Sequence, residues 1–195
     1  MDRGKRIQSV VALIEAHGHR CALVGGVAVS IRARERFTKD IDFVVAVKND
    51  GEAEALALTF QQAGYQLAHV FENTAKGLLA TLRFVVPGCR AEPELDLLFA
   101  SSGIEDEVVN AAELLELLPG LTAPVARLPH LIAMKVLAES DVREQDRADL
   151  QALIAVATKR ELELARKAVR LIEERGFARG KKLAEVLEGF VKRGK

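Results

Sequence analysis

Asp40 and Asp42, separated by one residue, stand at the start of an apolar stretch that continues to residue 47. On a β-strand alternate side chains point to the same face, so both carboxylates would share one face with Cα atoms about 6–7 Å apart. Two carboxylates in that position repel each other and lose hydration, and a shared cation offsets both effects. Because oxygen is the only ligand atom on offer, the pair favours Mg²⁺ or Mn²⁺ over Zn²⁺.

Gly25 and Gly26 follow a short apolar run, residues 21–24, and precede a helical pattern. Glycine allows backbone N–H groups to approach a phosphate, and a helix N-terminus adds positive potential there. Phosphate and metal together indicate a nucleotide. The sequence has neither the Gly-x-x-x-x-Gly-Lys-Ser/Thr loop nor the Gly-x-Gly-x-x-Gly fingerprint, which argues against the P-loop and dinucleotide-binding classes. Each signal alone is weak, because an isolated Asp-x-Asp is more often a strand-edge turn and an isolated Gly-Gly a tight turn.

The elements that must position these residues follow from the spacing of apolar side chains. It predicts strands over residues 21–24, 40–47, 65–70, 79–86 and 94–99. It predicts helices over residues 5–16, 27–34, 52–63, 105–118, 129–139, 146–158, 159–174 and 181–192. We therefore expect an α/β (α+β) fold, with a small mixed sheet flanked by helices in a catalytic domain of residues 1–102. A helical domain, residues 103–195, would pack against it.

The composition is that of a globular protein with no net charge, but positive and negative residues are unevenly distributed along the chain. The 195 residues include 28 Lys+Arg, 28 Asp+Glu and 49% hydrophobic residues, too many apolar groups and too little net charge for disorder. Residues 159–195 hold 12 Lys+Arg against 6 Asp+Glu, a net charge of +6 that leaves −6 for the rest. This basic end either attracts nucleic acid or an acidic partner, or is a solvated helix face with paired charges.

Targeting and redox signals are absent from the sequence pattern. No apolar run approaches the roughly 18 residues that cross a bilayer, and no apolar signal region follows the basic first residues, so we expect a cytoplasmic protein without membrane contact. Cys21 and Cys89 are too few for a disulfide framework and are expected to be buried thiols. The four histidines are scattered without metal-ligand spacing, which predicts surface or structural roles.

The order strand, Gly25-Gly26, helix and Asp40-x-Asp42 strand resembles the nucleotidyltransferase superfamily related to DNA polymerase beta. In that superfamily a third carboxylate comes from a later strand. The resemblance implies that Asp96, within the alternating stretch of residues 94–99, is this residue. Glu94 lies on the same face of the strand as Asp96 and is the alternative candidate. The first motif has Gly26 where many relatives have Ser, so backbone groups must replace a hydroxyl contact to phosphate.

A closer resemblance covers residues 124–150, where an apolar helix with Lys135 is followed by Arg143, Asp146 and Asp149. This stretch is similar to the segment after the catalytic domain in the AbiEii/AbiGii toxin-type nucleotidyltransferases. There a Lys on one helix and an Asp that opens the next return to the active site. The resemblance implies that Lys135 and Asp146 bind the nucleotide, and leaves open whether Asp146 or Asp149 faces the site.

The resemblance also implies a two-metal mechanism. Asp40 and Asp42 would hold two Mg²⁺ or Mn²⁺ ions together with the phosphates of an NTP. Asp96 would complete the coordination of the ion that activates the acceptor oxygen. Lys135 would neutralise charge near the triphosphate, unless it is a snorkelling lysine on a helix face. Arg36 and Thr38, just before the metal strand, would touch phosphate or order the loop, unless Thr38 is only a local cap.

The expected activity is therefore metal-dependent transfer of NMP from an NTP to an acceptor. The acceptor would be RNA such as tRNA, a protein or a small molecule, and toxin-type relatives imply an antitoxin partner in a toxin–antitoxin or abortive-infection system. Two alternatives remain open at this point. One is a non-catalytic nucleotide-binding or interaction module on the same fold, and the other is RNA binding through the basic end alone.

Overall fold

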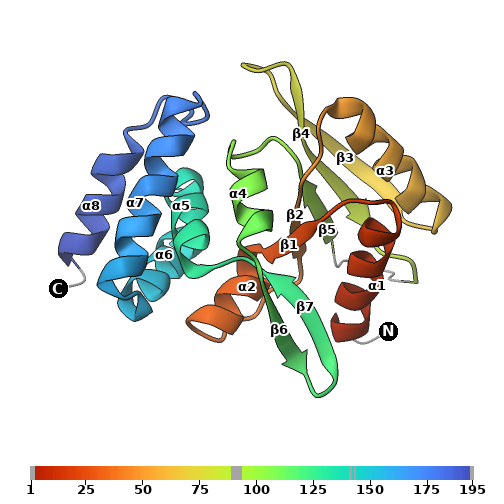
Figure 1. Ribbon diagram of the computed structural model, residues 1–195, viewed down its shortest axis with the longest axis horizontal. Coiled ribbons are helices and arrows are strands. Elements are labelled where there is room, and N and C mark those ends of the chain that lie inside the picture. The colour runs from red at the N-terminus through yellow and green to blue at the C-terminus, as the bar shows by residue number, and fades with distance from the viewer. Residues whose placement is uncertain (1–2, 89–93, 141, 143, 194–195) are drawn as a thin grey trace.

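The computed structural model describes residues 3–88, 94–140, 142 and 144–193, and it is built on one seven-stranded sheet (Figure 1). The strands are β1 (Cys21–Val24), β2 (Ile41–Val45), β3 (Gln66–Asn73), β4 (Leu78–Val85), β5 (Glu94–Leu98), β6 (Glu113–Leu118) and β7 (Leu121–Val125). Their order is β3-β4-β5-β2-β1-β7-β6. The pairs β2/β5 and β1/β7 are parallel and the other four are antiparallel, so the predicted mixed sheet is confirmed.

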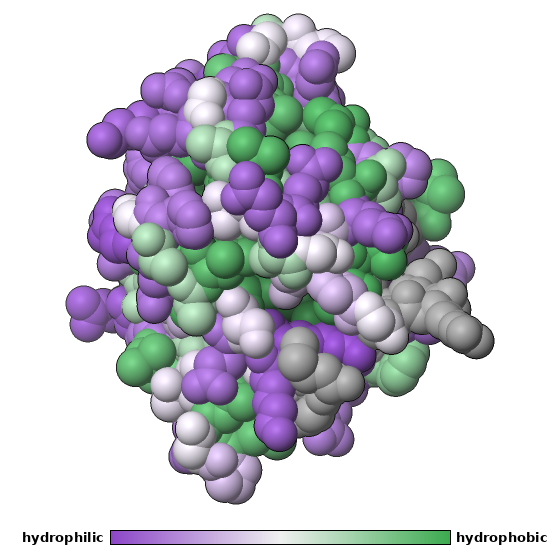
Figure 2. All heavy atoms as spheres, turned by 90° about the vertical axis from the view of Figure 1, so that its right-hand side faces the viewer, coloured by the Kyte–Doolittle hydropathy of each residue, from purple (hydrophilic) through white to green (hydrophobic). Residues whose placement is uncertain are grey.

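Helices cover both faces of this sheet (Figure 1). They are α1 (Arg3–Ala16), α2 (Gly25–Arg32), α3 (Asp50–Gln62), α4 (Glu105–Asn110), α5 (Leu128–Ala138), α6 (Glu144–Val156), α7 (Lys159–Glu174) and α8 (Leu183–Arg193). Helices α1 and α3 lie together on one side, where hydrophilic and hydrophobic side chains are interspersed at the surface (Figure 2). On the other side α2 and α4 contact β1 and β2, and α5 to α8 form a bundle beyond them. Within the described ranges, no helix is long and apolar enough to cross a membrane.

The apolar sequences of the central strands match their burial in the sheet. All four residues of β1 are buried, and β2 and β5 bury large side chains such as Phe43 and Leu97 completely, as expected for strands covered on both faces. Cys21 belongs to this core, and burial first, then the charge of Glu15, raises the pKa of its thiol to about 12. The expectation of a buried thiol is confirmed for Cys21. Cys89, Arg143 and the side chain of Glu94 lie outside the described residues.

The predicted helix over residues 105–118 is wrong beyond residue 110. The chain leaves α4 and forms β6, which pairs with β7, and β7 in turn pairs in parallel with β1. The leucines at 114, 115, 117 and 118 suit a helical spacing as well as a half-buried strand, and Pro124 disfavours a strand in the sequence pattern. Pairing with a strand about a hundred residues earlier decides the structure. The division of the chain at residue 102 stays a prediction.

A buried carboxylate joins β5 to α4. One oxygen of Glu105, which is 7% exposed, accepts hydrogen bonds from the backbone N–H groups of Ser101 and Ser102 at 2.9 and 2.6 Å. The hydroxyls of both serines donate to the same oxygen at 3.1 and 2.8 Å. Because four donors converge on it, the turn that follows the predicted Asp96 strand has one preferred conformation.

We expect Glu105→Ala to lower the free energy of unfolding by about 2–3 kcal/mol, because it leaves two buried backbone N–H groups without an acceptor. Urea unfolding followed by circular dichroism measures this. The matched control is Asp106→Ala, which removes an exposed carboxylate from the same helical turn and should change stability by less than about 0.5 kcal/mol. Equal effects of the two substitutions would contradict the role of Glu105.

Candidate active site

Four neighbouring strands align the central residues of the site in one row. The Cα of Val24 pairs with that of Asp42, Asp42 pairs with Asp96, and Asp96 pairs with Arg83. Directly paired residues project to the same face of a sheet, so the side chains of Asp42, Asp96 and Arg83 lie side by side. The strand register therefore brings together two aspartates that are far apart in the sequence.

The glycine pair allows Asp42 to lie against the start of α2. Gly25 has a φ of +59°, a left-handed conformation that glycine adopts without strain. A Cβ at Gly25 would lie 1.9 Å from Asp42 Oδ2, so a side chain at this position is excluded. The N–H of Gly26 donates a hydrogen bond to the Asp42 carboxylate. The first turn of α2 and β2 are thus in direct contact.

Arg36 and Thr38 occupy the space beside Gly26. A Cβ at Gly26 would lie 2.2 Å from Arg36 Nη2 and 2.9 Å from Thr38 Oγ1. The guanidinium group therefore fills the place where a serine at position 26 would put its side chain. This packing gives a physical reason for the departure from the serine-containing pattern, because a cation takes the place of a hydroxyl.

Lys135 on α5 binds two carboxylates of α6. Its Nζ lies 2.7 Å from Asp146 Oδ1 and 2.8 Å from Asp149 Oδ2. Arg36 Nε lies 3.2 Å from Asp149 Oδ1, and Gln145 donates to the same oxygen at 2.9 Å. Asp149 is completely buried, whereas Asp146 lines a cavity between the sheet and the helical bundle. Of the two aspartates that the resemblance left open, Asp146 and not Asp149 lines the cavity.

One cavity of about 1060 Å³ collects all the site residues expected from the sequence. Those residues are Gly25, Gly26, Arg36, Thr38, Asp40, Asp42, Asp96, Lys135 and Asp146. The cavity lies between the sheet and the helical bundle, and its far wall comes from the β3–β4 hairpin and the connection between α7 and α8. Its size is that of a small-molecule site.

Negative charge is crowded at the centre of this cavity. Burial, together with the charges of Asp96 and Asp40, raises the pKa of the Asp42 carboxyl to about 6, against the opposing influence of Lys135 and the Gly26 N–H. A carboxylate that is hard to ionise in this way is stabilised by a cation bound beside it. Asp40 and Asp42 therefore fit a divalent cation in both ligand type and electrostatics.

Arg83 is the main residue that the sequence interpretation missed. Its Nε and Nη2 donate to Asp96 Oδ1 and Oδ2, each at 2.8 Å, in a bidentate ion pair. Within the part of the chain that the structure describes, no three His, Cys, Asp or Glu side chains converge to hold a metal ion. The alternation of residues 79–86, which buries Leu82 and Phe84, was the available signal that Arg83 faces away from the core.

The fold is that of nucleotidyltransferases. An antigenic nucleotidyltransferase-like protein from Paracoccidioides brasiliensis superposes with a TM-score of 0.54 at 17% identity, over 95% of this chain and 91% of that one. ANT(2'')-Ia in complex with adenylyl-2''-tobramycin gives a TM-score of 0.49 at 14% identity, over 99% of both chains. The lincosamide antibiotic adenylyltransferase LnuA gives 0.49 at 13% identity, over 78% of this chain and 97% of that one. Only the first structure, with its TM-score of 0.54, supports the fold, and at 17% identity it shows the fold alone.

The family follows from the sequence. Residues 11–193 match the model of the nucleotidyl transferase AbiEii toxin of type IV toxin–antitoxin systems. Because the match spans almost the whole chain, the protein belongs to the AbiEii nucleotidyltransferase toxin family, as its motifs predicted. Comparison with curated proteins gives no match.

The raised pKa of Asp42 predicts a pH dependence for the metal-free protein. The folded state holds this proton up to about pH 6 but the unfolded chain only to about pH 4, so folding stability is lost as pH rises through that window. The loss at Asp42 is about 2–3 kcal/mol. We expect Asp42→Asn to remove it, so that the variant gains stability over wild type between pH 4.5 and 7. Urea unfolding in EDTA measures the difference, and a difference independent of pH would contradict the assignment.

Proposed function

We propose that the protein is a metal-dependent nucleotidyltransferase that transfers NMP from an NTP to an acceptor hydroxyl. The supporting observation is the single cavity that holds paired aspartates beside a glycine-opened helix and two cationic side chains. The acceptor oxygen attacks the α-phosphorus, the bond from that phosphorus to the bridging oxygen of the β-phosphate breaks, and pyrophosphate leaves. The acceptor hydroxyl loses its proton in the same step.

In this proposal Asp40, Asp42 and Asp96 hold the divalent cations. Bound Mg²⁺ or Mn²⁺ supplies positive charge to the phosphate oxygens and lowers the pKa of the acceptor hydroxyl. Arg83 holds both oxygens of Asp96 from the outer side of the row, so the carboxylate beside Asp42 has one fixed orientation. Asp96, which belongs to the acceptor side, takes the hydroxyl proton.

The triphosphate lies at the other end of the row. The start of α2 adds positive potential there, and Arg36 and Lys135 neutralise charge that builds on the leaving pyrophosphate. The buried Asp149 acts as a positioning residue, because it contacts both cations and holds them at the cavity wall. Thr38 packs beside Gly26 and orders the loop that leads to Asp40.

Family membership supports the biological part of the proposal. The protein acts in the cytoplasm as the toxin of a toxin–antitoxin pair, and an antitoxin protein is its partner. Incubation with each α-labelled NTP, a divalent cation and total cellular RNA or protein identifies the labelled acceptor. Nucleotide binding without label on any fraction would favour the non-catalytic module instead.

We expect the double variant Asp40→Asn/Asp42→Asn to lose NMP transfer by more than about a thousandfold, because the metal ligands are gone. Transfer of label from α-labelled NTP measures the loss. The control is Asp106→Asn, which changes an exposed carboxylate distant in sequence from Asp40 and Asp42. This variant should keep wild-type activity. Unchanged transfer and NTP binding in the double variant would overturn the proposal.

The positioning role of Asp149 makes a separate prediction. Asp149→Asn keeps the side-chain size but removes the charge that holds Lys135 and Arg36, so we expect the KM for Mg²⁺–NTP to rise about tenfold or more. Asp146→Asn leaves Asp149 to hold Lys135 and should raise KM less. The reverse order, measured by steady-state kinetics on folded variants, would assign the positioning role to Asp146.

A further inference from the structure

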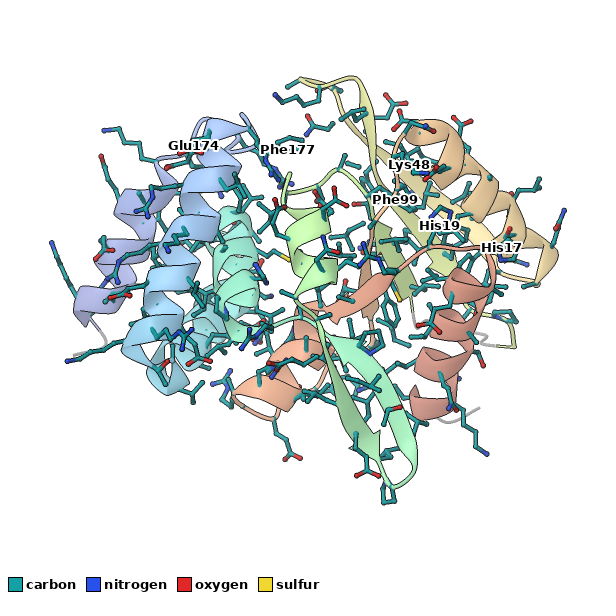
Figure 3. All side chains as sticks on the ribbon, in the orientation of Figure 1. His17, His19, Lys48, Phe99, Glu174 and Phe177 are labelled. Atoms are coloured by element: carbon teal, nitrogen blue, oxygen red, sulfur yellow. The ribbon has the colours of Figure 1, made fainter. Side chains whose placement is uncertain are left out.

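A second cavity, of about 270 Å³, lies between α4, α5 and α7, and we call it the α5–α7 pocket. Among the described residues, it shares no lining side chain with the larger cavity of the candidate active site. It contacts α5 in the first turn, at Pro129 and His130, whereas the larger cavity contacts α5 from Leu131 onward. Figure 3 shows Phe177, which lines the larger cavity, beyond the end of α7, and the α5–α7 pocket contacts α7 within residues 164–171.

Apolar side chains form most of the wall of the α5–α7 pocket. They are Ile104, Ala111, Pro129, Leu164, Ala168 and Leu171. Leu164 is 38% exposed, so apolar surface at this pocket is in contact with water and would gain from being covered. Sites for small molecules are lined in this way, and the volume lies just below the range of about 300–1,000 Å³ for drug-sized ligands. The pocket therefore suits a molecule with a single ring.

His130 brings an unpaired polar atom to this wall. Its Nδ1 is buried and has no hydrogen-bond partner among the described residues, although buried polar atoms in folded proteins are nearly always hydrogen-bonded. Burial lowers the pKa of the imidazole below its ordinary value, against the charge of Glu107 and together with that of Arg127. The ring is therefore uncharged at neutral pH and has one donor and one acceptor nitrogen. His130 thus has hydrogen-bonding capacity that the protein itself does not use.

The charged groups beside the pocket favour an anionic ligand. The carboxylate of Glu107 already accepts two hydrogen bonds from one arginine, at 2.9 and 2.6 Å. Arg127 shares Glu113 with Arg32, and the two ion pairs measure 3.0 and 2.7 Å. Two arginines on one carboxylate leave a positive charge in excess, and the exposed Lys167 adds another at the pocket. The N-terminal end of α5 contributes further positive potential.

We propose that the α5–α7 pocket binds a small molecule with a single-ring apolar body and one carboxylate group. The ring covers the apolar wall, and the carboxylate lies among Arg127, His130 and Lys167, where it accepts a hydrogen bond from the imidazole. A cationic compound would be repelled by the same groups. The bound molecule contacts the helix that carries Lys135 without occupying the larger cavity, so the inference is independent of the proposed transfer reaction.

Calorimetry with benzoate tests this proposal on the full chain. Benzyl alcohol is the matched ligand, because it has the same ring and no charge. We expect benzoate to bind about fivefold more tightly or better, since an exposed ion pair and a hydrogen bond to a charged group both favour the carboxylate. Saturation with Mg²⁺–NTP should leave benzoate binding unchanged, because the two cavities have separate linings.

Two substitutions locate the bound molecule. Ala111→Phe places a ring in the pocket from the partly exposed end of α4, so it should abolish binding of both compounds. Lys167→Gln should lower the affinity for benzoate and leave the affinity for benzyl alcohol unchanged. Lys159→Gln changes a lysine that is also exposed on α7 but does not line the pocket, and this matched control should bind benzoate like wild type.

The proposal is overturned if benzoate does not bind to the wild-type protein or binds no more tightly than benzyl alcohol. It is also overturned if Ala111→Phe, shown to be folded by circular dichroism, binds benzoate like wild type. Competition between benzoate and Mg²⁺–NTP would place the carboxylate beside Arg36 and Lys135 in the larger cavity and would contradict the assignment. Absence of NMP transfer would count against the proposed function alone, because benzoate binding is measured without any reaction.

Discussion

Repulsion among carboxylates at the centre of the cavity is the constraint on which the rest of the site depends. Register across β2 and β5 places Asp42 beside Asp96, and Asp40 adds a third negative charge close by. The protein balances this charge from two directions. Arg83 holds Asp96 from the outer strand, and the Gly26 N–H and Lys135 act on Asp42 from the opposite side.

The helical half therefore lines the candidate site and is more than a support for the sheet. Lys135 and Asp149 come from α5 and α6, and Asp149 joins Lys135 to Arg36 from the loop before β2. Because Arg36 occupies the space beside Gly26, the α5–α6 pair sets where positive charge lies relative to the first turn of α2. A change in the packing of these helices would shift the cations of the proposed triphosphate end.

Local patterns were enough to predict the aspartate pair, the glycine pair and most helices, since each depends on residues near in sequence. Helix α7 has the predicted bounds, residues 159–174, because Thr158 and Glu161 form a reciprocal capping box at its start. The helix predicted over residues 105–118 failed because β6 and β7 depend on pairing with β1. Arg83 was missed because its role arises from a neighbouring strand.

By itself the sequence determined which chemical groups are available and in what local geometry: carboxylates two residues apart on a strand, a side-chain-free helix start, and cations at intervals along the chain. Only the tertiary structure decided which of these groups meet. The register of β4 and β5 places Arg83 beside Asp96. The packing of the helices buries Asp149 and places Asp146 at the cavity. Such choices depend on contacts between residues distant in the chain, and no local pattern encodes them.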